Sequence, residues 1–284
     1  MKRVDSATAR PVLKWVGGKT KLLPKLLRLA PKEFLDYHEP FVGGGALFFA
    51  LYSAGRLKKK SWLNDANKEL MDVYVTVRDN VGGLIECLKV LPNTAEAFER
   101  IRNEPQPVPG VPLSVAEAAR TIYLNKTCFN GLYRVNRKGK FNSPFGRYKN
   151  PTICDEGNLS RAKLALSGVS LLSVNFEEAT FSVAKGDFVY FDPPYLQHED
   201  EKNFVGFTAE PFLEDDHERL AALAHLLVER GASVMVSNAD TPFARRLYKG
   251  PRFRIHSVKA PRSINSKGDA RGPVSEIIAV SKKQ

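Results

Sequence analysis

The chain has 284 residues, enough for one large domain or two modest ones, and its 43 basic and 31 acidic residues leave a net charge of +12, which indicates a polyanionic partner. Its three cysteines, Cys87, Cys128 and Cys154, form no C-x-x-C pair, which argues against a disulfide framework or a zinc site and fits a reducing compartment. Because the sequence contains neither an 18-residue apolar run nor an apolar segment after its basic start, we expect a cytoplasmic protein with no membrane partner.

The first motif follows a stretch, residues 1–10, that we expect to be a loose polar arm. Residues 12–19, Val-Leu-Lys-Trp-Val-Gly-Gly-Lys, approach a Gly-Gly turn through apolar positions, and a helix is predicted over 20–29. Trp15 offers a ring for stacking, and Lys14 and Lys19 present charge. The plainer alternative for this motif is an ordinary loop.

A second glycine motif follows the predicted strand at 35–41. It contains Gly43 and Gly45 and leads into a helix predicted over 46–54, and Asp65 ends the next strand twenty residues past Gly45. A strand, a glycine loop, a helix and an acid at this spacing are typical of a nucleotide-binding βαβ unit, in which the acid binds ribose hydroxyls. The pattern does not distinguish NAD from another adenosine cofactor.

The middle of the chain is predicted to be mainly helical. Helical periodicity runs from residue 66 to about 103, a loop with four prolines follows over 104–112, and Ser114 with Glu117 forms the capping box of a further helix. Residues 125–149 then interleave basic, amide and aromatic side chains, as in a hairpin with Gly139 near its tip. Such side chains contact phosphates and base edges, although a solvated basic hairpin is the alternative.

After residue 151 the α/β pattern resumes, with Phe176 directly after a predicted strand. We expect loops over 200–208 and 259–272, the latter basic, and the following helices and strands: helices over 159–166 and 212–230, and strands over 169–174, 188–191, 233–236, 253–258 and 276–280.

The strand at 188–191 ends in Asp192-Pro193-Pro194-Tyr195. Because proline has no N–H to donate, the strand must stop here, and Asp192 is held at its carboxyl end, where open α/β sheets bind ligands. An adenine amino group is a poor nucleophile; a carboxylate and a fixed carbonyl that both accept its N–H bonds favour its localised, reactive form, and Tyr195 gives the base a stacking face. The alternative is a strand that simply ends in a turn.

Four stretches occur in a telling order: Lys-Trp-Val-Gly-Gly-Lys, Pro-Phe-Val-Gly-Gly-Gly, the basic insertion and Asp-Pro-Pro-Tyr. With them the chain resembles, from about residue 11 to 280, the Dam-type DNA adenine-N6 methyltransferases of the D12 family. The resemblance implies an α/β fold: a Rossmann-like methyltransferase domain with a mixed sheet, formed by residues 1–65 and 153–284. This domain is interrupted by a mainly helical target-recognition domain with a β-hairpin, residues 66–152.

The resemblance also implies methyl transfer from S-adenosylmethionine to adenine N6, leaving S-adenosylhomocysteine, in double-stranded DNA from which the target base is flipped. It implies no metal, a monomer, and in some relatives a cognate restriction enzyme. The residues so implicated are catalytic Asp192, Pro193 and Tyr195; cofactor-binding Trp15, Lys19, Gly43, Gly45, Asp65, Phe176 and Asp192; and DNA-binding Lys14, Phe129, Asn130, Leu132, Arg134, Pro144 and Tyr148. Relatives with these DNA contacts read GATC, which is the site expected here.

Two positions depart from the family pattern. Phe129 stands where a tyrosine usually fills the gap left by the flipped base, which keeps the stacking and loses a hydroxyl. The usual Ser-Asn-His-Asp stretch is Ser237-Asn238-Ala239-Asp240, which removes any contact of that histidine.

Four rival functions differ in what they require. Cytosine-C5 methylation needs a cysteine nucleophile, generally after proline, and no cysteine here follows one. Cytosine-N4 methylation commonly has serine in place of Asp192. An NAD oxidoreductase leaves the basic hairpin unexplained, and a non-catalytic DNA-binding protein would show no dependence on a cofactor.

Overall fold

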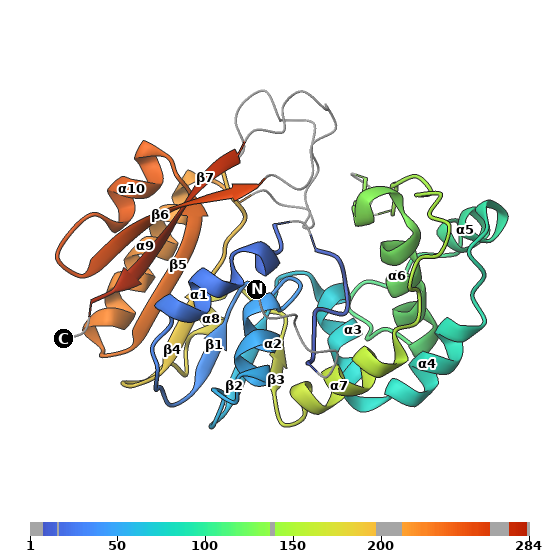
Figure 1. Ribbon diagram of the computed structural model, residues 1–284, viewed down its shortest axis with the longest axis horizontal. Coiled ribbons are helices and arrows are strands. Elements are labelled where there is room, and N and C mark those ends of the chain that lie inside the picture. The colour runs from blue at the N-terminus through green and yellow to red at the C-terminus, as the bar shows by residue number, and fades with distance from the viewer. Residues whose placement is uncertain (1–7, 16, 137–139, 197–211, 262–272, 283–284) are drawn as a thin grey trace.

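The computed structural model describes residues 8–15, 17–136, 140–196, 212–261 and 273–282. Its centre is a mixed seven-stranded sheet in the order β3-β2-β1-β4-β5-β7-β6 (Figure 1). The strands are β1 (Tyr37–Glu39), β2 (Ser61–Asn64), β3 (Ser170–Leu172), β4 (Phe188–Phe191), β5 (Ser233–Ala239), β6 (Phe253–Pro261) and β7 (Pro273–Ser281).

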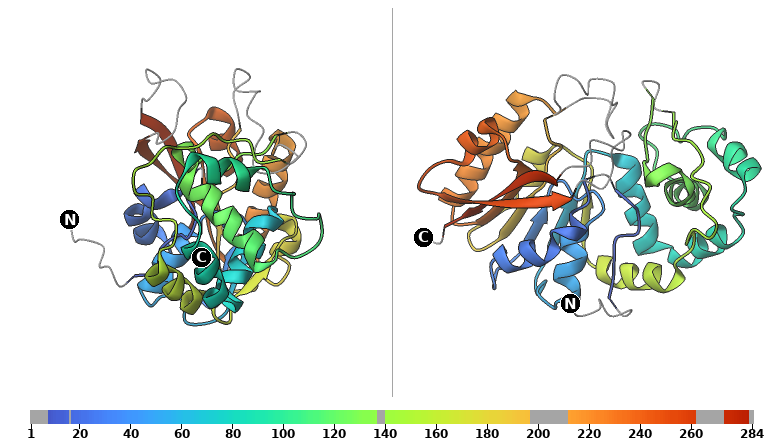
Figure 2. Two further views of the ribbon diagram at one scale, coloured as in Figure 1. Left: turned by 90° about the vertical axis from the view of Figure 1, so that its right-hand side faces the viewer. Right: turned by 45° about the horizontal axis from the view of Figure 1, so that its top comes forward.

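Helices flank the sheet and form a separate group beside it (Figure 2). The α-helices are α1 (Leu23–Leu29), α2 (Ala46–Ser53), α3 (Lys68–Asp79), α4 (Val81–Lys89), α5 (Ala95–Arg102), α6 (Val115–Thr127), α7 (Glu156–Leu166), α8 (Phe176–Ala179), α9 (Glu214–Glu229) and α10 (Pro242–Tyr248). Two 3-10 turns are η1 (Lys19–Lys21), before α1, and η2 (Phe129–Gly131), after α6.

The strand order places a switch point at the carboxyl ends of the parallel strands. Strands β1 to β5 are parallel, whereas β7 inserts antiparallel between β5 and β6. The chain order reverses between β1 and β4, and ligands of open α/β sheets bind at such a switch point beside the carboxyl ends of the strands. This is a Rossmann-like α/β fold with a mixed sheet, as expected.

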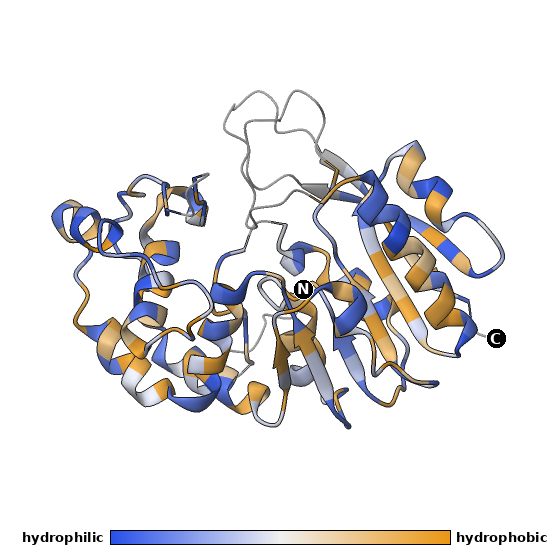
Figure 3. Cartoon of the chain, turned by 180° about the vertical axis from the view of Figure 1, so that it is seen from behind, coloured by the Kyte–Doolittle hydropathy of each residue, from blue (hydrophilic) through white to orange (hydrophobic). Residues whose placement is uncertain are grey.

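Side-chain alternation gives the sheet two apolar faces. In β4, Phe188 and Tyr190 join the core cluster beneath α1 and α2, whereas Val189 and Phe191 join the cluster beneath α9 and α10. Successive strand residues point to opposite faces, so a continuous apolar run is required when both are covered. In Figure 3, strands with orange segments lie between helices that alternate blue and orange. No helix within the described ranges is both long and apolar enough to span a membrane.

The helical group has a small core of its own. Phe98 of α5 is fully buried and its ring lies 5.2 Å from that of Phe145, 6.4 Å from that of Phe141 and 6.5 Å from that of Tyr123, measured between centroids. This cluster joins α5 and α6 to the predicted hairpin segment. Helix α6 begins with the predicted capping box of Ser114 and Glu117.

The amino-terminal segment is tied down by two asparagine clamps, so residues 8–10 are not the loose arm that the sequence predicted. Asn158 of α7 accepts from the Arg10 N–H (2.9 Å) and donates to the Arg10 carbonyl (3.0 Å). Asn125 of α6 does the same with Lys14, at 2.8 Å and 2.7 Å. Each side-chain amide therefore pairs with both backbone groups of one residue, as a neighbouring strand would.

Two local predictions were only partly right. The helix predicted over 20–29 is interrupted after η1, because Pro24 requires a new first turn. The hairpin is antiparallel, with isolated bridges between Cys128 and Phe145 and between Val135 and Phe141 in place of a regular ladder. Its predicted tip, Gly139, lies outside the described residues.

Near the carboxyl terminus the strands are longer than predicted. β6 continues to residue 261, so Lys259 belongs to a strand, paired with Ser275, and not to the expected loop. Helix α10 was not predicted, and Thr241 caps it. The remainder of the basic loop, with Arg262, Lys267 and Arg271, and the loop expected over 200–208 lie outside the described residues.

The small helical core gives a stability prediction. We expect Phe98→Ala to lower the free energy of unfolding of the helical group by about 3–5 kcal/mol, because it removes a fully buried ring and leaves a cavity. Urea unfolding measures the change. Phe181→Ala is the matched control, because this ring is 90% exposed and its loss should cost within about 0.5 kcal/mol. Equal midpoints for the two variants would contradict the assigned core.

Candidate active site

Asp192 stands at the carboxyl end of β4, directly after Phe191. It lies two positions after Tyr190, with Phe191 between them, so it points to the same face of the sheet as Tyr190, toward η1. There its Oδ1 atom forms an ion pair with Lys19 Nζ at 2.9 Å. The sequence placed both residues in the site, and the structure brings them into contact although they are far apart in the sequence.

Lys19 is the hub of the contacts in this pocket. Its ammonium donates to the Gly17 carbonyl at 2.8 Å, lies 4.8 Å from the centre of the Tyr195 ring and lies 4.0 Å from Glu276 Oε2. The Tyr195 hydroxyl in turn donates to Glu276 Oε2 at 2.7 Å. Lys19 is only 6% exposed, so these groups interact with little screening by solvent.

The electrostatics of Asp192 reflect a balance of opposing effects. Burial raises its pKa, the Lys19 ammonium lowers it, and the Glu276 carboxylate raises it, giving a value of about 6. The carboxyl group is therefore mostly ionised at neutral pH and becomes protonated as the pH falls below about 6. An ionised carboxylate offers only acceptor sites, which suits it to an N–H donor.

A second buried carboxyl group, Glu39, ends β1 beside Asp192. It is 3% exposed, and its Oε2 atom accepts a 2.8 Å hydrogen bond from the Tyr37 hydroxyl. Burial raises its pKa to about 8, the Tyr37 hydrogen bond opposes this, and the Asp192 charge adds to it. Glu39 is thus mainly protonated at neutral pH, which avoids a second uncompensated anion next to Asp192.

Asp65 organises the glycine loop. Its two carboxylate oxygens accept from the backbone N–H groups of Gly43 and Asn67, each at 3.0 Å. Burial raises the pKa of Asp65 to about 6, against these two hydrogen bonds. The loop is further fixed by Tyr74, whose hydroxyl donates to the Gly43 carbonyl at 2.7 Å.

Trp15 lies against the same loop. A Cβ atom at Gly43 would lie 2.8 Å from Trp15 Cδ1, and φ is +47° at Gly43, so only glycine fits this position. Gly45 likewise has φ of +67° at the start of α2. The loop therefore leaves bare backbone between a half-buried indole and a carboxylate.

Phe176 lies deeper than a surface stacking residue. It is 6% exposed, at the start of α8, and its ring centroid is 5.7 Å from Phe41 and 5.9 Å from Phe212. The Arg219 guanidinium lies 5.4 Å from its ring centre. Phe176 is therefore one of three packed rings, with Phe41 and Phe212, that a ligand at this edge would contact as a group.

The seven residues predicted to bind DNA are brought together from three segments. Lys14 Nζ lies 4.9 Å from the centre of the Tyr148 ring, and the Phe129 N–H donates to the Pro144 carbonyl at 2.8 Å. The Arg134 side chain is held through Nε by Asn142 Oδ1 at 2.9 Å. Four of the seven are exposed, Lys14, Phe129, Asn130 and Pro144, and three are half-buried, Leu132, Arg134 and Tyr148.

Backbone geometry fixes this surface. Asn130 and Gly131 have positive φ angles of 56° and 65°, so the chain turns sharply after Phe129 and leaves its ring 51% exposed. At Gly146 a Cβ atom would lie 2.8 Å from the carbonyls of Thr127 and Cys128, which only glycine avoids. The hairpin segment at Gly146 can therefore approach the segment at Thr127 and Cys128 closely.

The sequence interpretation missed Glu39 and Glu276 as members of the site. Each lies at the carboxyl edge, on the face that carries Asp192. A carboxylate at the start of an otherwise apolar strand, as in Glu-Ile-Ile-Ala-Val at 276–280, could have marked Glu276 as a candidate. The sequence does not show which residues such a carboxylate contacts, because they are remote in the chain.

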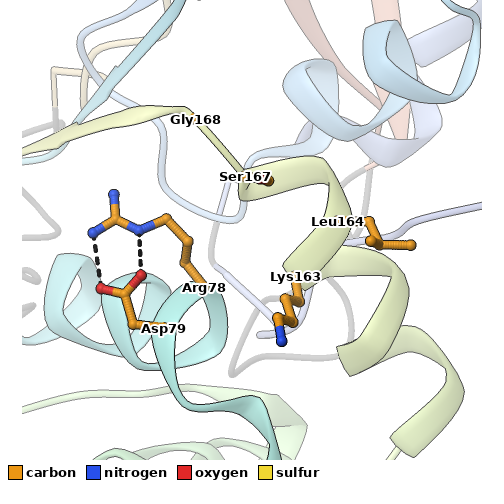
Figure 4. Close-up of a pocket in the computed structure, with 6 residues that line it drawn as sticks. All are labelled: Arg78, Asp79, Lys163, Leu164, Ser167 and Gly168. Carbon is orange, nitrogen blue, oxygen red and sulfur yellow. Dashed lines mark hydrogen bonds and ion pairs between the residues drawn. The ribbon is translucent and has the colours of Figure 1, made fainter.

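A separate hollow of about 370 Å³ lies between the ends of α3 and α7 (Figure 4). Arg78 forms an ion pair with Asp79 there at 2.7 Å and donates to the Val169 carbonyl at 3.0 Å. It lies at the opposite end of α3 from Asp65, so it is not part of the site. Among the described residues, no three acidic, histidine or cysteine side chains gather as metal ligands.

Residues 15–264 match the family model described as D12 class N6 adenine-specific DNA methyltransferase. The chain belongs to this family. The match contains the Lys19–Asp192 pair, the glycine loop and the basic hairpin. Membership makes the protein an adenine-specific DNA methyltransferase and supports adenine methylation over the cytosine, NAD and non-catalytic alternatives.

Individual relatives agree over nearly full length. The chain is 39% identical to the Type II methyltransferase M1.LlaDCHI of Lactococcus lactis subsp. cremoris, over 96% of this chain and 95% of the relative. It is 41% identical to the Type II methyltransferase M.MjaIII of Methanocaldococcus jannaschii, over 92% and 95%. It is 33% identical to the DNA adenine methylase of Escherichia coli K12, over 96% and 95%.

The protonated Glu39 gives a prediction for this methyltransferase. Its pKa is higher in the folded than in the unfolded protein, so folding retains a proton and stability falls as pH rises from about 4.5 to about 8. Glu39→Gln cannot ionise and keeps an acceptor for Tyr37. We expect the variant to gain stability relative to the parent over this interval, measured by urea unfolding at several pH values.

The matched control is Glu33→Gln, an exposed residue in the turn after α1. It makes the same substitution at an exposed position, and the pH-dependent gain of Glu39→Gln is measured against it. A Glu39→Gln gain no greater than that of Glu33→Gln would show that Glu39 ionises normally in the folded protein.

Proposed function

We propose that the protein transfers a methyl group from S-adenosylmethionine to N6 of an adenine flipped out of double-stranded DNA, at GATC. Asp192, Pro193 and Tyr195 are the catalytic residues. The observation that supports this most directly is the rigid placement of the Asp192 carboxylate, between β4 and two prolines, with an aromatic ring beside it.

Methylation of the adenine amine requires groups that accept hydrogen bonds from its N–H donors, and it does not require a base of high pKa. The lone pair of the amine is delocalised into the ring, so N–H bonds accepted by Asp192 and the Pro193 carbonyl favour a pyramidal nitrogen that can attack. Tyr195 stacks on the base and holds this geometry. When bound, S-adenosylmethionine would supply a methyl group on a positively charged sulfur. The sulfur–methyl bond would break as the N6–methyl bond forms, S-adenosylhomocysteine would leave and the amine would lose one proton, without a covalent enzyme intermediate or a metal.

The residues around the glycine loop fit that cofactor. The bare backbone at Gly43 and Gly45 is a cradle that a Cβ atom would fill, with Trp15 on one side and Asp65 on the other. Each Asp65 oxygen accepts one backbone bond and has a further lone pair for a ribose hydroxyl. Lys19, Phe176 and Asp192 complete the proposed binding set.

Recognition of the duplex falls to the surface formed by Lys14 and the hairpin, within a target-recognition domain over 66–152. Exposed basic and amide groups suit phosphates and base edges, and the protruding Phe129 ring suits the gap left by the flipped base. The GATC assignment rests on the resemblance to relatives that read this sequence, at six positions: Lys14, Asn130, Leu132, Arg134, Pro144 and Tyr148. The enzyme acts as a cytoplasmic monomer.

A direct test uses purified protein, S-adenosylmethionine labelled in its methyl group and duplexes with or without one GATC. We expect label in N6-methyladenine only in the GATC duplex, and protection of plasmid DNA from a nuclease that cuts unmethylated GATC. Label in cytosine would contradict the proposed reaction, and label in adenine elsewhere would contradict the proposed site.

The same assay includes Asp192→Ala, which should lose turnover and keep duplex binding because the recognition surface is separate from Asp192. Asp215→Ala, an exposed carboxylate at the start of α9, is the control and should retain the parent rate. Full activity of Asp192→Ala would remove the proposed role of this residue.

Arg134→Ala tests base reading. We expect a loss of about 1–3 kcal/mol in discrimination at one base pair, because a guanidinium positioned by Asn142 is removed. The measurement is kcat/KM on GATC duplexes and on duplexes with each single base changed. Lys140→Ala, an exposed cation on the other arm, is the control, and it should weaken all duplexes equally. Equal loss on all duplexes for Arg134→Ala would make it a phosphate contact.

A further inference from the structure

Glu276 occupies an unusual position for a carboxylate. It lies in β7, the strand between β5 and β6, where it pairs with Ala239 on one side and Val258 on the other. Neither of these apolar side chains offers a charge or a hydrogen bond, and the Glu276 side chain is only 13% exposed. Burial of a charge costs free energy unless it is paired, so a purely structural role favours another residue here.

The contacts of Glu276 lead into the active site. The residue after next, Ile278, packs on the face beneath α1 and α2, so Glu276 points to that same face, where Lys19 lies. Its Oε2 atom accepts from the Tyr195 hydroxyl at 2.7 Å and lies 4.0 Å from Lys19 Nζ. One carboxylate thus contacts both the ring proposed to stack on adenine and the cation that neutralises Asp192.

Asp192 faces a conflict between two donors. In this structure Lys19 lies 2.9 Å from its Oδ1 atom, which is the type of contact that the adenine amine must make for the proposed reaction. If Asp192 were the only anionic partner of Lys19, the ammonium would compete with the substrate amine for this carboxylate. A lysine released without another anion would be left as a buried, unpaired charge.

We propose that Glu276 is a positioning residue that shares Lys19 with Asp192 and holds the Tyr195 ring, so that Asp192 is free to accept from the target amine. The inference rests on the proposed roles of Asp192 and Tyr195. The required movement of Lys19 Nζ is small, because it already lies at 2.9 Å and 4.0 Å from the two carboxylates. Glu276 does not touch the reacting atoms and acts through Lys19 and Tyr195.

The charge of Glu276 also has a measurable signature. The groups that face Asp192 are Lys19 of η1, Glu276 of β7, Glu39 and Tyr37 of β1, and Tyr190 and Tyr195 beside it. Of the two charged groups that shift the pKa of Asp192, Lys19 lowers it and Glu276 raises it. Removal of the Glu276 charge therefore lowers this pKa, so the acid limb of the rate profile moves to lower pH.

The test is Glu276→Gln, which keeps an oxygen for the Tyr195 hydroxyl and removes only the charge. Single-turnover methylation of a GATC duplex should slow by about tenfold to a hundredfold, because a displacement of about 1 Å at a reacting group has effects of this size. Binding of the duplex and of S-adenosylmethionine should stay unchanged, and the acid limb should move to lower pH. Glu33→Gln, exposed and remote, should match the parent in all three measurements.

The outcomes separate this inference from the function on which it rests. If the parent does not methylate adenine, or Asp192→Ala is fully active, the proposed function fails. If both behave as proposed but Glu276→Gln has the parent rate and an unmoved acid limb, only the role of Glu276 fails. A slower rate with an unmoved limb likewise overturns it, since any loss of structure could slow the reaction.

Tyr195→Phe provides a second measurement if Glu276→Gln does not fold, which thermal unfolding would show. This variant keeps the stacking ring and removes its hydrogen bond to Glu276. We expect at least tenfold slower single-turnover methylation with unchanged duplex binding. A rate equal to that of the parent would overturn the proposed anchoring.

Discussion

The ion pair between Lys19 and Asp192 is the interaction on which the site depends. It joins η1, near the start of the chain, to the end of β4, and it compensates a carboxylate that burial would otherwise protonate. The neighbouring groups limit the net charge in the pocket: Glu39 retains its proton, Tyr195 donates a hydrogen bond to Glu276, and Lys19 lies between the carboxyl groups of Asp192 and Glu276. The parallel topology makes this possible, because it delivers the ends of β1 and β4 to one edge, where antiparallel β7 adds Glu276.

The features that could be predicted from the sequence are those with local causes. Asp192-Pro193-Pro194-Tyr195 marks a strand end because proline cannot continue a ladder, and the capping box of Ser114 and Glu117 spans three residues. Helix α10 was missed because its seven residues carry little periodic signal. Glu276 was missed because its partner Tyr195 lies 81 residues away, and no local pattern encodes which strand β7 will join. The hairpin was predicted from composition, which does not encode where its isolated bridges form.

The buried carboxylates Asp65 and Asp192 differ in the groups that they contact. Asp65 accepts two backbone N–H groups and so shapes the glycine loop, whereas Asp192 pairs with the side-chain ammonium of Lys19. A carboxylate bound by fixed backbone donors is a structural anchor. A carboxylate paired with a side-chain ammonium has no such backbone constraint, which distinguishes the two sites although burial raises the pKa of both to about 6.

The asparagine clamps have a consequence for how this family can diversify. The segment from Arg10 to Lys19 is fastened to α7 by Asn158, to α6 by Asn125 and to β4 by Lys19 itself. A side chain at the proposed DNA surface, Lys14, is therefore only five residues from the hub of the catalytic pocket. Exchange of the helical insertion between homologues would replace α6 and with it the contact of Asn125 with Lys14. A new sequence preference would therefore require compensating changes in the first twenty residues.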